Sequence, residues 1–168
     1  VDGAIGGIAR CSASLAPLFR GIESADSVAF DLHKWFFMPY ESGCVLIKDS
    51  KRHRETFSVP TAYLAPLKGG LADSSEPIFN DLSLDLSRSM KSLKVWMSVQ
   101  TYGLKAFSQI IEQNVAFAAK LRTLITEAFP ELELMAESSL NIVCFRYKAP
   151  GLSGVKLDEF NRLIIIHM

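Results

Sequence analysis

Long hydrophobic runs, an excess of charge of one sign and a cysteine framework are all missing from this sequence. The longest apolar runs, at residues 35–39 and 163–166, are far shorter than the roughly 20 residues that a membrane-spanning helix needs. Eighteen basic residues balance eighteen acidic ones, so the charge gives no sign of a nucleic-acid partner. The three cysteines form no CxxC pair, which disfavours a disulfide framework or a zinc site and favours a reducing compartment. We therefore expect a cytoplasmic protein without a membrane, nucleic-acid or metal partner.

The glycine-rich patterns GxGxxG and GxxxxGK[ST], which mark nucleotide-binding loops, are absent as well. The sequence nevertheless begins with a cluster of small residues: Gly3, Ala4, Gly6 and Gly7. Side chains this small let a flat ring approach the backbone closely, although an ordinary turn is the alternative interpretation.

The composition is that of a globular chain, because 49% of the 168 residues are hydrophobic and 21% are charged. This length allows one ordinary domain with a sizeable core. The sequence begins with Val1 instead of methionine and stops at Met168 directly after an apolar run. We therefore expect it to be an internal piece of a longer protein.

Two short apolar segments, 27–30 and 43–48, predict buried strands. A short helix is predicted at residues 14–23, which gives the beginning of the chain a strand, helix, strand order. This order suits a crossover between parallel strands. Asp2 and Lys34 would then lie at the carboxyl ends of two strands of one sheet, where ligands bind in open α/β sheets.

The second half of the sequence has a clear helical period. Residues 50–88 predict a long loop, after which helices are expected at 90–102 and 104–129. The longer helix carries one apolar stripe, formed by Leu104, Phe107, Ile111, Val115, Ala118, Leu121 and Ile125. The remaining predicted elements are strands at 131–135 and 140–147, joined at 137–139, and a helix at 157–166.

The densest group of reactive side chains is Asp31, His33 and Lys34, directly before the apolar residues 35–39. An ammonium group beside apolar side chains loses solvation, so we expect Lys34 to have a lowered pKa and a neutral amine that can form an imine. Asp2, at the end of an apolar strand, is suited to hold a proton on the nitrogen of a pyridine ring. Considered alone, such a lysine is more often exposed and chemically idle.

Four stretches carry a resemblance to a known family: VDGAIGG, ADSVAFDLHKW, the YL of TAYLAP, and LSRSMKSLKVW. In order and spacing they are similar to the group II pyridoxal-dependent decarboxylases, which include the aromatic L-amino-acid decarboxylases. The likeness runs from Val1 to about Tyr147. It implies an α/β fold, part of a fold-type I transferase-like large domain. Residues 1–129 would be the C-terminal part of that cofactor-binding domain, and residues 130–168 would begin a small α+β C-terminal domain.

The resemblance also implies roles for single residues around the cofactor, pyridoxal 5'-phosphate. Lys34 resembles the lysine that forms a Schiff base with the cofactor, and Asp2 resembles the carboxylate that pairs with the ring nitrogen. Ala4 would pack against one face of the ring. His33 and Asp31 would lie near the cofactor phosphate and the substrate, and His33 would take part in catalysis.

Asp31 departs from the family pattern, because many aromatic amino-acid decarboxylases resemble NPHKW where this sequence has DLHKW. An acidic side chain near a phosphate repels it unless the carboxyl group is protonated or turned away. This weighs against Asp31 as a partner of the phosphate. Trp35, in contrast, resembles the aromatic branch of the family more than the HKM form of animal glutamate decarboxylases.

Two further residues are implied to act across a homodimer. Ser87 would approach the phosphate of the cofactor in the neighbouring subunit. Tyr63 is similar to a loop tyrosine that reaches the partner's site and protonates the carbon left after CO2 departs. Relatives that oxidise that carbon to an aldehyde typically carry phenylalanine there, so Tyr63 favours decarboxylation. A merely packed aromatic residue is the alternative.

The expected activity is therefore decarboxylation of an L-amino acid, with an aromatic side chain favoured, to the amine and CO2. One alternative is another fold-type I lyase with the same cofactor, such as an acidic amino-acid decarboxylase or an enzyme resembling sphingoid-phosphate lyases. The other alternative is an inactive truncated fragment. In the family, most of the phosphate-binding loop and the aromatic stacking residue lie upstream of Val1, so we expect the isolated chain to bind the cofactor poorly.

Overall fold

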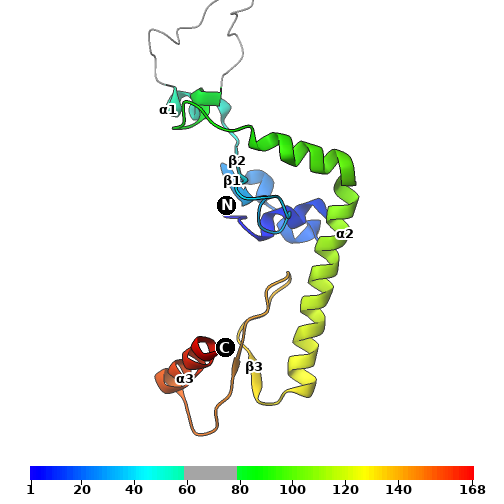
Figure 1. Ribbon diagram of the computed structural model, residues 1–168, viewed down its shortest axis with the longest axis vertical. Coiled ribbons are helices and arrows are strands. Elements are labelled where there is room, and N and C mark those ends of the chain that lie inside the picture. Colours follow the sequence, from blue (N-terminus) through cyan, green and yellow to red (C-terminus); the bar gives the residue numbers. More distant parts are fainter. Residues whose placement is uncertain (59–78) are drawn as a thin grey trace, which may run out of the picture. The chain divides into compact units, whose positions relative to one another are not determined.

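A computed structural model of the chain describes residues 1–58 and 79–168 (Figure 1). Contacts among these residues gather into two compact units, Val1–Gly103 and Leu104–Met168, which we call the first and the second unit. Within the described ranges, no helix has both the length and the apolar character needed to cross a membrane. The predicted boundary between a large and a small domain, after residue 129, concerns a complete enzyme and stays a prediction.

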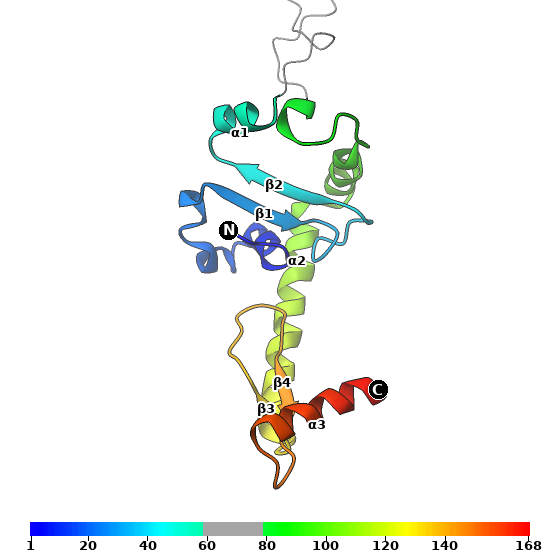
Figure 2. The same cartoon turned by 90° about the vertical axis from the view of Figure 1, so that its left-hand side faces the viewer.

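An antiparallel pair of strands, β1 (Ser27–Asp31) and β2 (Gly43–Ile47), forms the sheet of the first unit (Figure 2). Asp31 lies opposite Gly43 at the end of this ladder. Branched and aromatic side chains in both segments favour paired strands. The strands predicted at 27–30 and 43–48 are confirmed, but their predicted burial is wrong, because Val45 and Leu46 are 53% and 58% exposed.

The first residues of the chain run parallel to β1. Asp2 forms a parallel bridge with Ala29, and the backbone N–H of Gly3 donates to the Ala29 carbonyl oxygen at 2.7 Å. A Cβ atom at Gly3 would lie only 3.1 Å from that oxygen, so the close approach requires glycine. The predicted parallel direction of the first residues of the chain and β1 is confirmed.

The single helix predicted at residues 14–23 is wrong. Three short 3-10 helices connect the parallel segments instead: η1 (Gly6–Cys11), η2 (Ala16–Phe19) and η3 (Ile22–Ser24). Gly21 separates the last two with a φ of +93°, which an α-helix does not contain. The glycine therefore ends a helix that the apolar residues around it would otherwise favour.

Helix α1 (Ser50–Phe57) occupies the start of the segment predicted to be a long loop, so that part of the prediction is wrong. The helix begins at Asp49, whose Oδ1 accepts a backbone hydrogen bond at 2.9 Å. Arg54 ties α1 to the 3-10 helix η6 (Phe79–Leu82), because its Nη2 lies 2.9 Å from Oδ2 of Asp81. Apolar spacing does not reveal α1, since none of its residues is buried.

Helix α2 (Lys91–Ala128) is interrupted at Gly103, where φ is +74° and ψ is 151°. One predicted helix ends and a longer one begins at this position, so both predictions are confirmed. Four members of the predicted apolar stripe are buried: Phe107, Ile111, Ala118 and Ile125. Leu104 and Leu121 are 54% and 41% exposed, so the buried stripe is narrower than predicted.

The rest of the second unit consists of two short antiparallel strands, β3 (Leu132–Leu134) and β4 (Phe145–Tyr147), and helix α3 (Gly154–His167). Asn161 joins α3 to β4. Its Oδ1 accepts from the Tyr147 N–H at 2.8 Å, and its Nδ2 donates to the Tyr147 carbonyl oxygen at 3.0 Å. Both strands and the final helix are confirmed, but the connection between the strands is longer than the predicted turn at 137–139.

Candidate active site

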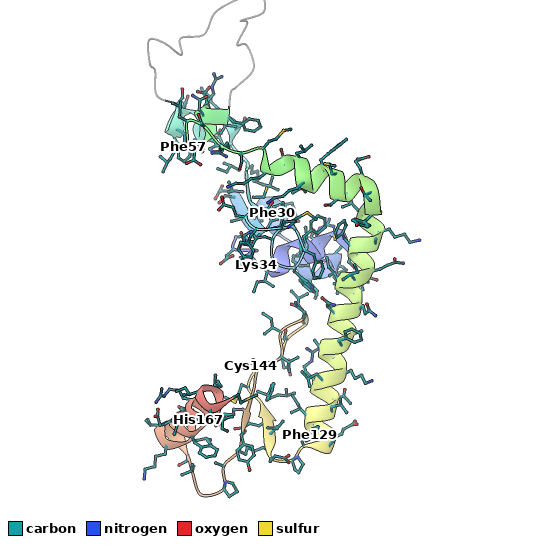
Figure 3. All side chains as sticks on the ribbon, in the orientation of Figure 1. Phe30, Lys34, Phe57, Phe129, Cys144 and His167 are labelled. Carbon is teal, nitrogen blue, oxygen red and sulfur yellow. The ribbon has the colours of Figure 1, made fainter. Side chains whose placement is uncertain are left out.

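The backbone turns sharply after β1, in a segment that we call the Lys34 turn (residues 31–42). The N–H of Lys34 donates to the Asp31 carbonyl oxygen at 3.2 Å. The apolar residues that anchor this turn are almost fully buried: Trp35, Phe36 and Met38, at 4%, 2% and 5% exposure. Their burial leaves the side chain of Lys34 at the surface, just beyond the end of β1, with 38% exposure (Figure 3).

Lys34 forms an ion pair with Asp31, in which Nζ lies 2.8 Å from Oδ2. The hydrogen bond to this carboxylate raises the pKa of Lys34 above its ordinary value, and electrostatic interactions with Tyr40 and Asp2 add to the shift. The same hydrogen bond lowers the pKa of Asp31. The prediction that Lys34 has a lowered pKa is therefore wrong, because the ion pair outweighs the loss of solvation.

His33 is held on two sides, and one of these contacts fixes its tautomer. The backbone N–H of Ser42 donates to Nδ1 at 3.0 Å. A nitrogen that accepts this hydrogen bond carries no proton, so neutral His33 is protonated on Nε2. The ring also packs on Tyr40, with centroids 4.2 Å apart, and Nε2 lies 4.0 Å from Oδ2 of Asp31. The arrangement leaves an N–H donor of His33 on the side of the Lys34 ion pair.

Asp2 and Ala4 belong to the parallel segment beside β1. Oδ1 of Asp2 accepts a hydrogen bond from the Ala4 N–H at 2.9 Å, and the Ala4 carbonyl oxygen accepts one from the Asp31 N–H at 3.3 Å. The Asp2 carboxylate is near enough to Lys34 to contribute to its raised pKa. The structure therefore brings five predicted site residues together around the end of β1 and the segment bridged to it: Asp2, Ala4, Asp31, His33 and Lys34.

Sequence reasoning missed the residues that hold the far side of the Lys34 turn. Nζ of Lys94 donates to the carbonyl oxygens of Pro39 and Glu41, at 2.6 Å and 2.8 Å. Lys91, one turn earlier in α2, pairs with the Glu41 side chain and lowers its pKa. Ser42, the residue after Glu41, is only 2% exposed. Two lysines three residues apart at the start of a predicted helix were the available signal, but their partners depend on the tertiary fold.

Two predicted site residues remain to be considered. Tyr63 lies outside the residues that the structure describes. Ser87 is exposed and lies on the segment between η6 and α2. The roles predicted for both concern the site of a partner subunit and stay predictions.

A comparison with known protein families identifies the family to which the chain is similar. The sequence pattern described as the pyridoxal-dependent decarboxylase conserved domain matches residues 1–148. This chain belongs to the pyridoxal-dependent decarboxylase family. The matched range contains the whole Lys34 turn together with Asp2, Ala4, Tyr63 and Ser87.

Curated proteins similar to this member of the family include both a decarboxylase and an aldehyde synthase. An aromatic-L-amino-acid decarboxylase of Bacillus atrophaeus is 32% identical over 165 residues, which cover 98% of this chain and 34% of that protein. A 3,4-dihydroxyphenylacetaldehyde synthase of Aedes aegypti is 34% identical over 148 residues, which cover 88% of this chain and 28% of that protein. The chain spans about a third or less of the length of these relatives.

A solved structure of this family has the same fold over the matched length. The crystal structure of Oryza sativa TDC with PLP and tryptamine superposes with a TM-score of 0.87 at 26% sequence identity. The match covers 99% of this chain and 34% of the rice protein. The mixed helix and strand arrangement described above is therefore that of the corresponding third of a decarboxylase.

Proposed function

We propose that this chain supplies the lysine-bearing part of an enzyme that decarboxylates an L-amino acid to the amine and CO2, with pyridoxal 5'-phosphate as cofactor. The observation that carries the proposal is the meeting of Lys34 and Asp2 at neighbouring strand ends, in a sequence that matches the family over residues 1–148. Strand ends of this kind are where α/β folds bind their ligands.

The described residues fit this cofactor by the chemistry that they present. Pyridoxal phosphate requires an amine for covalent attachment, an acid beside its ring nitrogen and hydrogen-bond donors for its phosphate. Lys34 offers the amine, Asp2 the carboxylate and His33 the Nε2–H donor. Ala4, between Asp2 and Asp31, has a side chain small enough for a flat ring to lie against it.

Each of these side chains has a separate task in the proposal. When bound, pyridoxal phosphate supplies an electrophilic aldehyde and a protonated ring that accepts the electron pair released as CO2 leaves. Lys34 would hold the cofactor through its amine, and Asp2 would keep the ring nitrogen protonated through its negative charge. His33 donates its Nε2–H to an anionic group of the cofactor or substrate. Tyr63 delivers a proton to the substrate carbon after CO2 has left.

The proposal extends to the assembly and location of the complete enzyme. We place residues 1–129 in a fold-type I large domain and residues 130–168 at the start of a small α+β domain. The enzyme would be a cytoplasmic homodimer, in which Ser87 and Tyr63 serve the site of the partner subunit. The resemblance of the sequence to the family supports these assignments.

The proposed substrate has an aromatic side chain. An aromatic-L-amino-acid decarboxylase is 32% identical to this chain, and the similar rice structure contains tryptamine. Trp35, which resembles the aromatic branch of the family, is only 4% exposed. Its contribution is therefore to anchor the Lys34 turn, and the support for an aromatic substrate comes from the relatives.

A second candidate function is oxidative decarboxylation, in which O2 and water convert the amino acid to an aldehyde, CO2, ammonia and hydrogen peroxide. The similarity to an Aedes aegypti 3,4-dihydroxyphenylacetaldehyde synthase, at 34% identity, favours it. Tyr63 argues against it by resemblance, because relatives that form aldehydes typically have phenylalanine at the position of this tyrosine. The identity of the product separates the two candidates.

Substitution of Lys34 in the complete enzyme tests the proposal. Incubation with pyridoxal phosphate followed by borohydride should label the Lys34 peptide, and aromatic amino acids should yield amines. We expect Lys34→Ala to lose the label and to slow amine formation by more than about 10³-fold, as expected when a covalent group is removed. The control Lys51→Ala, which removes a lysine that is 85% exposed on α1, should change neither.

The outcomes of this experiment are distinct. Undiminished amine formation by Lys34→Ala would reject the proposal. An aldehyde with the carbon skeleton of the decarboxylated substrate would favour the oxidative candidate. Mass spectrometry of the products distinguishes amine from aldehyde directly.

A further inference from the structure

The carboxylate of Asp31 is positioned by three neighbours. Its Oδ2 lies 2.8 Å from Nζ of Lys34 and 4.0 Å from Nε2 of His33. Its Oδ1 lies over Gly43, the residue opposite Asp31 in the β1–β2 ladder, where a Cβ atom would be only 3.3 Å away. The ladder and the glycine together leave room for this carboxylate beside the lysine.

We propose that Asp31 is a positioning residue that further stabilises the ammonium form of Lys34 whenever the lysine is not joined to the cofactor, and that it thereby slows the joining reaction. This rests on the proposed function, because it takes Lys34 to be the cofactor lysine. Asp31 then acts on the cofactor through Lys34 and not through the phosphate.

The chemistry of attachment explains why the ion pair matters. An ammonium ion has no lone pair, so Nζ must first release one proton to solvent. The neutral amine then adds to the aldehyde carbon, and the C=N bond forms as the aldehyde oxygen leaves as water with the two remaining amine hydrogens. A carboxylate 2.8 Å away favours the ammonium form and so reduces the fraction of lysine that can react.

Other charged groups around Lys34 act in the same direction but less strongly. The hydrogen bond to Asp31 is the largest cause of the raised pKa of Lys34, and electrostatic interactions with Tyr40 and Asp2 are smaller causes. Lys34 and His33 lower the pKa of Asp31, with Lys34 as the larger cause, so Asp31 is ionised at neutral pH. Removal of the Asp31 charge should therefore shift the reactivity of Lys34 only part of the way to that of a free lysine.

The experiment measures how fast Lys34 reacts in the complete enzyme after the cofactor has been removed. Wild type, Asp31→Asn and Asp31→Glu are incubated with pyridoxal phosphate or with pyridoxal, which lacks the phosphate, between about pH 6 and pH 9. Borohydride then traps the product, and mass spectrometry quantifies the labelled Lys34 peptide. Asp26→Asn is the matched control, because Asp26 lies exposed before the opposite end of β1.

We expect Asp31→Asn to accelerate labelling of Lys34 about tenfold at each pH of this range, with both aldehydes, because a larger fraction of the lysine is then the neutral amine. Asp31→Glu should keep most of the wild-type pH profile, and Asp26→Asn should keep all of it. A labelling rate of Asp31→Asn equal to that of wild type across this pH range would overturn the inference. So would an acceleration seen only with pyridoxal phosphate, since Asp31 would then act by repelling the phosphate.

Gly43→Ala provides a second route if Asp31→Asn fails to fold. The added Cβ would lie 3.3 Å from Oδ1, so the carboxylate must move by a few tenths of an ångström while its charge remains, and we expect a smaller acceleration of labelling. A labelling rate equal to that of wild type would count against the inference. Failure of the proposed function is recognised separately, because Lys34 would then remain unlabelled by pyridoxal phosphate in every variant.

Discussion

The Lys34 turn and the second unit of this protein are stabilised in different ways. In the second unit, apolar residues at helical spacing are buried along α2, and Ile111 is completely inaccessible to solvent. In the Lys34 turn, three buried apolar side chains anchor an irregular backbone whose polar groups bind one another, such as Asp31 with Lys34 and Ser42 with His33. Regular packing can be predicted from spacing, whereas the chemistry depends on specific polar contacts.

This difference places function in the region with the least regular backbone. Residues on a turn can present several side chains to one point, provided that neighbouring elements hold the turn. Here β1 and the buried Trp35 hold one side of the turn, and Lys94 of α2 binds the other side through the carbonyl oxygens of Pro39 and Glu41. The rigid parts of the first unit therefore fix Lys34 without contributing reactive groups themselves.

The largest expected effect comes from removing the charge of Asp2. In the complete enzyme, we expect Asp2→Asn to reduce kcat by roughly 10²- to 10⁴-fold, on the scale of a lost proton-holding group. A neutral amide cannot stabilise a proton on the ring nitrogen. Steady-state amine formation measures the effect, and borohydride labelling of Lys34 should continue because the amine is still present.

Asp26→Asn makes the same chemical change before the amino end of β1 and should leave kcat within about twofold of wild type, as expected for a surface substitution. If both variants lost activity equally, charge in general would matter and the position at the carboxyl ends of the strands would not. The comparison between the Lys34 turn and the rest of the molecule would then lose its functional meaning.

The stability of the second unit should depend more on the volume of its buried side chains than on charge. Ile111 is 0% exposed and Leu121 is 41% exposed, although both belong to the predicted apolar stripe of α2. We expect Ile111→Ala to lower the free energy of unfolding by about 2–5 kcal/mol, because it leaves a cavity. Leu121→Ala should cost less than about 1 kcal/mol, as at other partly exposed positions.

Urea denaturation followed by circular dichroism measures both variants of α2. Equal losses would show that the two positions are buried alike and that the stripe is as wide as the sequence predicts. Labelling of Lys34 under native conditions should stay at the wild-type level in Leu121→Ala.

Sequence patterns were sufficient to predict secondary structure where buried residues recur at a helical period. The break of α2 at Gly103 and helix α3 could be predicted in this way, because glycine and apolar spacing are local properties. Helix α1 could not, since its N-cap at Asp49 is a single residue and none of its residues is buried. The 3-10 helices around Gly21 were missed because one positive φ outweighs the helix-favouring residues beside it.

The proximity of Asp2, Asp31 and Lys34 was predictable from the sequence, but their electrostatics were not. Lys34 and Asp2 could be selected from their places after apolar strands and from the family resemblance. The ion pair between Lys34 and Asp31 depends on the register that puts Gly43 opposite Asp31, and no local pattern encodes that register. This is why the direction of the lysine pKa shift was predicted wrongly.

Backbone strain offers a finer test of the same contrast. Gly103 and Phe37 both have positive φ values, +74° and +58°, but only the break in α2 uses glycine. A left-handed conformation costs a residue with a side chain about 1–2 kcal/mol. We expect Gly103→Ala to destabilise the protein by about that amount or more, because its ψ of 151° adds to the strain.

At Phe37, which is 52% exposed, the informative comparison is between Phe37→Gly and Phe37→Ala, since both remove the ring. The glycine variant should be more stable than the alanine variant by up to about 1 kcal/mol, after the greater flexibility of unfolded glycine is subtracted. Thermal denaturation measures the difference. A more stable alanine variant would show that the Lys34 turn stores no strain at this residue.

The smallest expected effect is the pH dependence of stability that arises from the Asp31–Lys34 pair. The folded state lowers the pKa of Asp31, so its contribution is present above the ordinary carboxyl pKa of about 4 and is lost as the pH falls through the lowered value. The folded state raises the pKa of Lys34, so its contribution is present below the ordinary value of about 10.4 and is lost as the pH rises through the raised value. Both side chains are partly exposed, and solvent screening keeps the contribution small.

The melting temperature of wild type should therefore exceed that of Asp31→Asn most clearly near neutral pH. The gap should narrow on acidification below about pH 4, and a gap that is constant across that range would indicate that packing and not charge makes the difference.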